Sequence, residues 1–239
     1  MSAPEKIGAF FDLDGTLLNE PSLEWRFLAH LLERDEIRTR NVAHWLAHAG
    51  KTILFDPRRA THANKLYLAG IPESAVADWA DAFSAEPLPL FTEGISQVDW
   101  HIERRHQVFF VTGTLAPLAR AFARGLPYDV AISATELEVH DRHFSGCLAG
   151  PHMDFGAKVR AVGEWAATRG LDLSQSYAYG NQMSDAPMLE TVGNPVAANP
   201  SWRLAHHARK RGWTICRWSD PGTSPGIAGH TSLAPKAAR

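Results

Sequence analysis

The feature of this chain that most constrains its fold is an apolar run near the N-terminus that ends in two carboxylates. Residues Ile7–Phe11 are apolar, and Asp12 and Asp14 follow, with Gly15 and Thr16 after them. Such a run predicts a buried strand that ends in a charged turn. Two acids in an apolar setting are costly unless a neutralising group, such as a divalent cation, binds them. The motif alone leaves open an ordinary strand-to-loop junction, with Asp as turn former.

Length and composition are those of a soluble globular protein. The chain has 239 residues, of which 45% are hydrophobic and 21% charged, enough for a sizeable core in one domain, with or without an insertion. The net charge of -2 gives no indication of a nucleic-acid partner. The basic run at 206–211 stands just before Gly212 and is typical of a helix C-terminus.

Cysteine usage and hydropathy indicate a reducing compartment and no membrane. Cys147 and Cys216 have neither metal-ligand spacing nor a close partner, which favours the cytoplasm. The first residues lack the apolar region of a signal peptide, and no apolar run reaches the length of a membrane span. We therefore expect a cytoplasmic protein without a membrane partner, and the oligomeric state stays open.

A helical unit follows the first strand. Between residues 21 and 86, apolar side chains recur at helical spacing. They fall in three groups: Leu23, Phe27, Leu28, Leu31 and Leu32; Val42, Trp45, Leu46 and Ala49; and Val76, Trp79, Ala80 and Phe83. Pro87 and Pro89 mark the return from this unit. The pattern predicts a small helical bundle inserted into the fold.

Strands and helices alternate through the rest of the chain. The predicted strands are Gln107–Val111, Asp129–Ile132, Tyr177–Tyr179 and Pro195–Ala198, with a β-hairpin over Glu136–Cys147 and helices from Leu115 and from Lys158. This alternation predicts an α/β fold whose parallel sheet is covered on both faces. Active sites of such sheets gather at the carboxyl ends of the strands.

Polar residues with complementary chemistry stand at those strand ends. Asp12 could be a nucleophile or metal ligand, Asp14 could deliver a proton, and Asp185 could hold a cation or its waters. Thr112 supplies a hydroxyl, Gly113 an N–H and Lys158 a positive charge for an anion. Taken singly, Thr112 could be a strand-end hydroxyl, Lys158 a surface lysine and Asp185 a helix N-cap. Together they suit phosphoryl transfer better than acyl transfer, for which the chain has no convincing G-x-S-x-G motif.

Four ordered motifs resemble those of the haloacid dehalogenase superfamily, in its subfamily IB branch similar to phosphoserine phosphatase. The matching residues are Asp12–Thr16, Val111–Gly113, Lys158, and Gly180–Asp185 with Pro187–Leu189. The resemblance implies a three-layer Rossmann-like core formed by residues 1–18 and 90–218. It also implies a helical cap of type C1 over residues 19–89. Residues 219–239 are expected to be a disordered tail.

The resemblance also implies roles for the two acids. Asp12 would attack phosphorus to form an aspartyl-phosphate, and Asp14 would protonate the leaving alcohol and then activate water. Members similar to dehalogenases do not use this second acid, so Asp14 favours phosphate esters. The implied function is a Mg²⁺-dependent phosphomonoesterase acting on a small phosphorylated metabolite.

Further site residues come with the same resemblance. Mg²⁺ would be held by Asp12, the main-chain carbonyl of Asp14 and Asn181, with Asp185 acting through water. Thr112, the Gly113 N–H and Lys158 would hold the phosphoryl oxygens. The fourth motif commonly begins Gly-Asp, whereas this chain has Gly180-Asn181. A neutral amide predicts weaker Mg²⁺ affinity.

Candidate substrate residues lie in the expected cap. Phosphoserine phosphatases carry an acidic residue after the first motif that binds the substrate ammonium, and Glu20 stands one position early, with Ser22 nearby. Arg58 and Arg59 could face a carboxylate or phosphate of the substrate, or could simply be solvated. Two alternative functions remain, a non-hydrolytic phosphate-binding regulator and a phosphotransferase.

Overall fold

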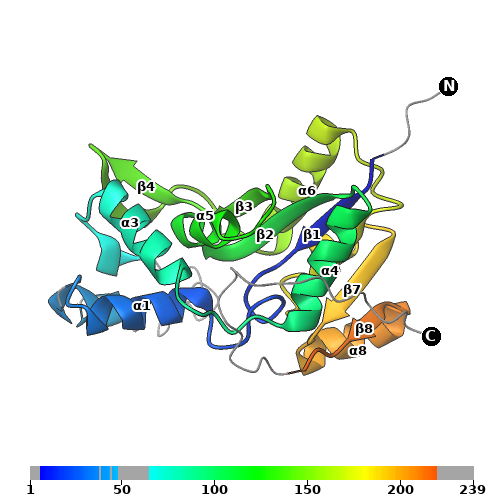
Figure 1. Cartoon of the computed structure of the whole chain (residues 1–239), viewed down its shortest axis with the longest axis horizontal. Coiled ribbons are helices and arrows are strands. Elements are labelled where there is room, and N and C mark those ends of the chain that lie inside the picture. The colour runs from blue at the N-terminus through cyan, green and yellow to red at the C-terminus, as the bar shows by residue number, and fades with distance from the viewer. Residues whose placement is uncertain (1–5, 38, 44, 48–64, 220–239) are drawn as a thin grey trace.

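A six-stranded parallel sheet forms the centre of the computed structural model, which describes residues 6–37, 39–43, 45–47 and 65–219. The strand order is β3-β2-β1-β6-β7-β8, and every neighbouring pair is parallel (Figure 1). The bounds are β1 Gly8–Phe11, β2 Gln107–Leu115, β3 Ala131–Thr135, β6 Tyr177–Gly180, β7 Asn194–Ala198 and β8 Thr214–Cys216. Five of these strands coincide at least in part with the predicted ones.

The strand order places a crevice beside β1. Chain order runs outward from β1 through β2 to β3 on one side, and from β6 through β7 to β8 on the other. In open parallel sheets, ligands bind outside the carboxyl ends of the strands at such a reversal of order. The loops after β1 and β6 therefore face one another at the position where the motifs predict a site.

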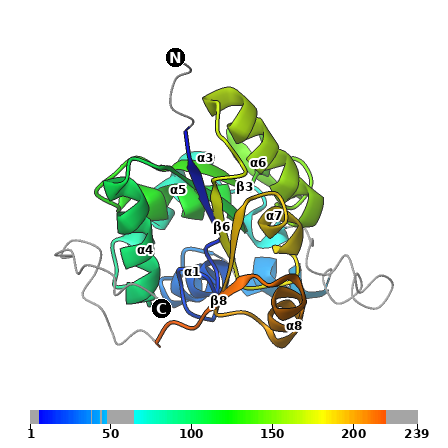
Figure 2. The ribbon, with the colours of Figure 1, turned by 90° about the vertical axis from the view of Figure 1, so that its right-hand side faces the viewer.

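Helices cover both faces of the sheet. Helices α4 (Thr92–Glu103) and α5 (Ala116–Arg124) lie on one face, and α6 (Phe155–Arg169), α7 (Ala186–Leu189) and α8 (Trp202–Arg211) lie on the other, as Figure 2 shows. The alternation of strand side chains builds a core on each side. Phe10 belongs to the cluster that contains α6 to α8, and Phe11 to the cluster that contains α4 and α5. The predicted three-layer α/β architecture is confirmed.

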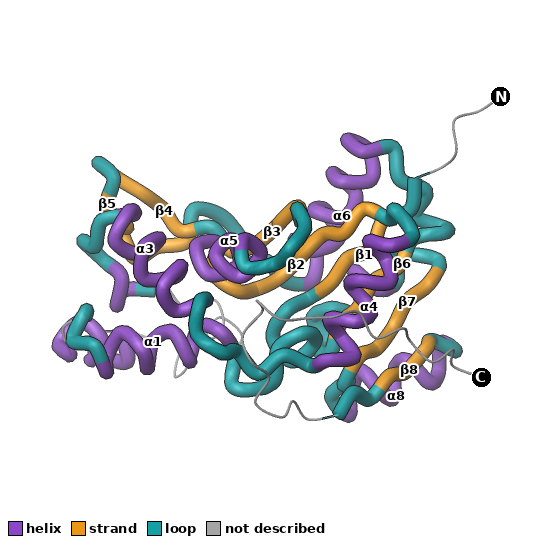
Figure 3. Tube along the Cα trace, in the orientation of Figure 1, coloured by secondary structure: helices purple, strands orange, loops and turns teal. Residues whose placement is uncertain are grey.

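The described residues between β1 and β2 are mainly helical, as predicted. Helix α1 spans Leu23–Glu33, residues 39–43 and 45–47 are helical, the short 3-10 helix η2 spans Leu66–Leu68, and α3 spans Glu73–Ser84. The predicted hairpin is confirmed as β4 (Leu137–His140) and β5 (His143–Leu148). The hairpin lies beside this helical segment (Figure 3), and the Gly70 N–H donates to the Phe144 carbonyl at 2.8 Å.

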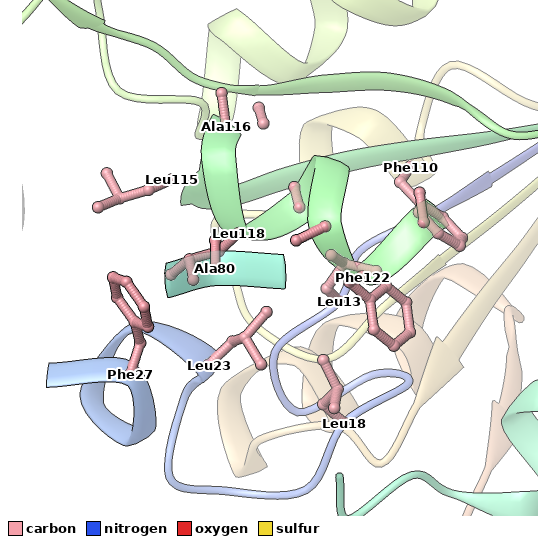
Figure 4. Close-up of a cluster of buried hydrophobic side chains, with 14 of the residues drawn as sticks. Leu13, Leu18, Leu23, Phe27, Ala80, Phe110, Leu115, Ala116, Leu118 and Phe122 are labelled. Atoms are coloured by element: carbon pink, nitrogen blue, oxygen red, sulfur yellow. The ribbon is translucent and has the colours of Figure 1, made fainter. Parts of the chain in front are cut away.

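The helical segment shares its apolar core with the sheet domain. Figure 4 shows Phe27 of α1 and Ala80 of α3 in one cluster with Leu118 and Phe122 of α5. All four side chains are at most 1% exposed. Burying a large apolar side chain contributes about 1.5–3 kcal/mol, so this cluster fixes α1 and α3 against the sheet. The division of the chain into a core and a cap stays a prediction.

Several boundaries differ from those predicted. Strand β2 continues to Leu115, so the Thr112–Thr114 run lies within the strand rather than after it, and the next helix begins at Ala116 rather than at Leu115. Helix α6 begins at Phe155 rather than at Lys158. Helix α4 and strand β8 were not predicted, and the third strand begins two residues later than predicted. Helix α8 ends at Arg211, with Gly212 in the left-handed conformation, as the basic run predicts.

Some predictions lie outside the described residues. They include Ala49 of the second helical group, Arg58, Arg59 and the predicted tail apart from Ser219. Within the described ranges, no helix is long and apolar enough to cross a membrane. Cys147 and Cys216 are both free thiols.

Candidate active site

The loop after β1 brings the first motif into a tight turn. The Leu13 carbonyl accepts hydrogen bonds from the N–H groups of Thr16, Leu17 and Leu18 at 2.8–3.0 Å. Gly15 has a φ of 76°, which favours glycine. A Cβ atom at Gly15 would lie 1.9 Å from Nδ2 of Asn181. Glycine thus serves both the turn and the close approach of the loop after β6.

Asp12, Lys158 and Asp185 form a buried ionic chain. The Lys158 ammonium lies 2.7 Å from Oδ1 of Asp12 and 2.7 Å from Oδ1 of Asp185. The three residues are at most 6% exposed. They come from the end of β1, the first turn of α6 and the residue before α7. The predicted site residues from three distant parts of the sequence therefore meet at one point.

Burial and charge act in opposite directions on this chain. Burial raises the pKa of Asp12 to about 7, with Lys158 lowering it and the carboxylate of Asp185 raising it. Burial lowers the pKa of Lys158, but Asp12 and Asp185 raise it by more, so it stands above its ordinary value. With both carboxylates ionised, Asp12, Lys158 and Asp185 together carry a formal charge of -1. A further positive charge beside Asp12 would favour its ionised form.

Asp14 has a different set of partners. Its Oδ1 accepts from the Leu23 N–H at 2.6 Å, and its Oδ2 accepts from the Thr114 hydroxyl at 2.7 Å. Burial raises the pKa of Asp14 above its ordinary value, and these two donors partly offset that effect. A carboxyl group with a raised pKa is protonated more often at neutral pH, which suits a proton donor.

Two of the three predicted anion-binding residues, Thr112 and Gly113, lie on β2, near Asp14. The Thr112 hydroxyl is 2.9 Å from the Thr114 hydroxyl, and both residues are buried. A Cβ atom on Gly113 would lie 2.8 Å from Cε1 of His152, so the imidazole packs directly against the glycine backbone. Thr135 donates to the Gly113 carbonyl at 2.8 Å. These contacts fix the end of β2 from both sides.

Asp185 also holds the loop after β6. Its Oδ2 accepts from the N–H groups of Asn181 at 3.0 Å and Gln182 at 2.8 Å. Both carboxylate oxygens of Asp185 therefore accept hydrogen bonds, Oδ1 from Lys158 and Oδ2 from the two main-chain N–H groups. The Asn181 side chain is buried, and none of the described residues forms a hydrogen bond with its Oδ1.

This donor set fits a hard divalent cation. Asn181 Oδ1 is a buried oxygen without a donor, and an unsatisfied buried polar atom is unfavourable. It lies in a site whose acids, Asp12, Asp14 and Asp185, outnumber the one lysine. Carboxylate, carbonyl and amide oxygens are the ligands that Mg²⁺ takes. In the described ranges no group of three or more His, Cys, Asp and Glu side chains is placed to hold a metal, so such a site would depend on the amide and a main-chain carbonyl.

A cavity of about 240 Å³ opens onto these groups. It is lined by Asp12, Asp14, Glu20, Ser22, Glu24, Thr112, Gly113, Thr114, His152, Met153, Asp154, Lys158, Asn181, Gln182, Ser184 and Asp185. All the predicted catalytic, phosphate and metal residues are thus brought together, as are Glu20 and Ser22. A larger groove of about 620 Å³ near the end of α5 contains none of them.

Several lining residues were not predicted as site residues. Thr114 could have been found, because residues two apart on a strand share a face with one another, as Thr112 and Thr114 do. Glu24 and His152 gave no comparable signal. Glu24 is bound by Lys65 at 2.8 Å and by the Tyr67 hydroxyl at 3.0 Å, a cluster that only the folded segment brings together.

Comparisons with known proteins show the family of this chain. The model of the haloacid dehalogenase-like hydrolase family matches residues 9–190. A Mycobacterium tuberculosis protein named phosphoserine phosphatase SerB1 is 32% identical over 217 residues, which cover 87% of this chain and 69% of that protein. A Neisseria meningitidis histidinol-phosphatase is 25% identical over 224 residues, covering 87% of this chain and 96% of that protein.

Solved structures share the fold. A Bordetella pertussis protein of unknown function superposes with a TM-score of 0.73 at 27% identity, over 88% of this chain and 98% of the other. A phosphoserine phosphatase, described as a phospho-aspartyl intermediate analogue, has a TM-score of 0.59 at 19% identity, over 90% and 95% of the two chains. The family match covers well over half of the sequence. This chain belongs to the haloacid dehalogenase-like hydrolases.

Proposed function

We propose that this phosphatase of the haloacid dehalogenase-like family hydrolyses a small phosphorylated metabolite through an aspartyl-phosphate, with Mg²⁺ as cofactor. The observation that carries the proposal is the pairing of Asp12 with Lys158 at 2.7 Å beside a second acid, Asp14, that has only neutral donors. One acid is held next to a cation and the other is disposed to carry a proton. Phosphomonoester hydrolysis needs both.

The two acids divide the reaction into two steps. In the first, an Asp12 oxygen bonds to phosphorus while the ester P–O bond breaks, and the Asp14 proton passes to the leaving alcohol oxygen. In the second, the Asp14 carboxylate takes a proton from water, whose oxygen attacks phosphorus. Inorganic phosphate leaves, and Asp12 regains its carboxylate. Protonated Asp14 is restored for the next turnover.

Three groups would bind the phosphoryl oxygens. An ammonium has three N–H donors, and Lys158 uses two of them on Asp12 and Asp185. The third is available to a phosphoryl oxygen. The Thr112 hydroxyl and the Gly113 N–H would donate from the end of β2. Lys158 lies in the first turn of α6, whose N-terminal dipole adds to its attraction for an anion.

Asp12, the main-chain carbonyl of Asp14 and Asn181 would hold Mg²⁺, with Asp185 acting through water. When bound there, Mg²⁺ would neutralise charge on the phosphoryl oxygens and on Asp12. The buried Asn181 oxygen without a donor supports this assignment. The neutral amide in place of a carboxylate predicts weaker affinity for the metal.

Substrate choice is assigned to a helical cap formed by residues 19–89, over a core of residues 1–18 and 90–218. Glu20 and Ser22 of this segment line the cavity and are proposed to contact the substrate, as are Arg58 and Arg59. The names of two relatives make phosphoserine and histidinol phosphate the first compounds to test. A cytoplasmic setting and a small-molecule partner complete the proposal.

A phosphatase assay with and without EDTA tests the proposed function. We expect release of phosphate from p-nitrophenyl phosphate and from at least one phosphorylated amino acid or amino alcohol, abolished by EDTA and restored by Mg²⁺. Absence of turnover with every ester would instead support a phosphate-binding regulator. Product in excess of released phosphate would indicate transfer to an acceptor other than water.

A further inference from the structure

A buried hydroxyl pair connects the phosphoryl-binding end of β2 with the second acid. Thr114 is 3% exposed, and its hydroxyl lies 2.7 Å from Oδ2 of Asp14 and 2.9 Å from the hydroxyl of Thr112. The Thr114 N–H also donates to Oγ1 of Thr112 at 3.2 Å. A single side chain therefore contacts both Asp14 and Thr112.

The opposite oxygen of Asp14 is fixed by the main chain. The Leu23 N–H lies 2.6 Å from Oδ1, in the first turn of α1. One donor on each oxygen sets both the position and the plane of the carboxyl group. Without Thr114, Asp14 would have only the Leu23 donor among its hydrogen bonds in the described structure. The carboxyl group could then rotate about its remaining contact.

We propose that Thr114 is a positioning residue for proton transfer, and that it orients the Asp14 carboxyl group toward the oxygen of the leaving alcohol. The inference rests on the proposed function, because it assigns Thr114 a part in the first step of the phosphatase reaction. A hydroxyl suits this position because it can donate to the Asp14 carboxylate and accept from the protonated acid. Valine has nearly the same shape and can do neither.

The leaving group distinguishes positioning of the acid from general support of the site. An alkoxide leaves poorly without a proton, whereas p-nitrophenolate leaves readily without one. Thr114→Val is therefore expected to lower kcat about 10- to 100-fold on an alkyl phosphate such as phosphoserine, a range that corresponds to loss of one buried hydrogen bond in the transition state. On p-nitrophenyl phosphate the loss is expected to stay within about threefold.

Matched variants separate this effect from disruption of the site. Thr114→Ser keeps the hydroxyl and should restore most of the rate on the alkyl ester. Thr135→Val removes another buried hydroxyl, which bonds to the Gly113 carbonyl and accepts from the Met153 N–H rather than contacting Asp14. That variant should lower the rate on both substrates by a similar factor. Thermal unfolding of each variant reports on folding.

The experiment is the ratio of kcat on the alkyl ester to kcat on p-nitrophenyl phosphate for the four proteins. A ratio lowered in Thr114→Val, restored in Thr114→Ser and unchanged in Thr135→Val supports the inference. Equal losses on both esters, no loss, or no rescue by serine would overturn it. If the valine variant does not fold, Thr114→Cys, a weak donor of similar size, carries the same comparison. An inactive wild-type protein would refute the proposed function instead.

Discussion

The two carboxylates of the first motif lie two positions apart in sequence but in different electrostatic surroundings. Asp12 contacts the Lys158 ammonium, which it shares with Asp185 in a buried ionic chain. Asp14 contacts a main-chain N–H and a hydroxyl, both neutral. The difference shows how one short motif can supply both a nucleophile and a proton carrier. The partners, which except for Leu23 come from distant segments, assign the roles.

The largest expected effect is on the nucleophile. Asp12→Asn should lower turnover of every phosphate ester by about 10⁴-fold or more, because the loss of covalent catalysis removes the main route of the reaction. Asp14→Asn should instead give a loss of about 10²–10⁴-fold that is greatest for poor leaving groups. Steady-state kinetics on an alkyl and an aryl phosphate measure both. If the two variants lost the same turnover on the alkyl phosphate and the same turnover on the aryl phosphate, the division of roles would be contradicted.

Removal of the shared cation should affect stability as well as activity. Lys158→Met leaves Asp12 and Asp185 buried without their common partner, and the expected loss in the free energy of unfolding is about 3–5 kcal/mol at neutral pH without metal. Urea unfolding measures this loss. Lys65→Met is the matched control, since Lys65 is a buried lysine paired with one carboxylate, Glu24. A smaller loss is expected there, and an equal or larger one would weaken the account of the ionic chain.

The proposed affinity for Mg²⁺ depends on Asn181. Asn181→Asp adds a charge to the cavity that Asp12 also lines and should lower the Mg²⁺ concentration for half-maximal rate by about tenfold, equivalent to about 1.4 kcal/mol. The shift in thermal unfolding with added Mg²⁺ gives a readout independent of activity. An unchanged or higher Mg²⁺ requirement would show that residue 181 does not contact the cation.

The last expected effect is the pH dependence of stability without metal. The folded pKa of Asp12, about 7, stands above its unfolded value of 3.8, so the folded protein binds more protons between these pH values. The contribution of Asp12 is therefore fully present below pH 3.8 and is lost as the pH rises through 7. Relative to Asp12→Asn, the wild type should lose about 2 kcal/mol between pH 5 and 7. Parallel curves for the two proteins in urea unfolding would contradict the raised pKa.

The sequence predicted the sheet and the meeting of the motifs better than it predicted the surroundings of each side chain. Parallel strands place their carboxyl ends at one edge, so Asp12, Thr112 and Asn181 could be brought together from strand positions alone. The contacts of His152 and Glu24 depend on how loops and inserted helices pack, which no local pattern contains. Strand β8 has three residues and no distinct alternation, and it was missed for that reason.

Thr114 could be predicted from the sequence only in part. Its place on a buried strand face follows from Thr112, but its bond to Asp14 joins positions 100 residues apart and needed the folded structure. Its role illustrates the limit of predicting a site from the sequence. Strand ends predict which residues share a site, whereas the contacts within the site determine what each one does.

The central claim is tested most directly by trapping the covalent intermediate. A single turnover with excess enzyme, quenched in acid and mapped by mass spectrometry, should place one phosphoryl group on the peptide that contains Asp12. The label should be absent in Asp12→Asn. A phosphoryl group on another residue, or full turnover by Asp12→Asn, would contradict the assignment of Asp12 as the nucleophile.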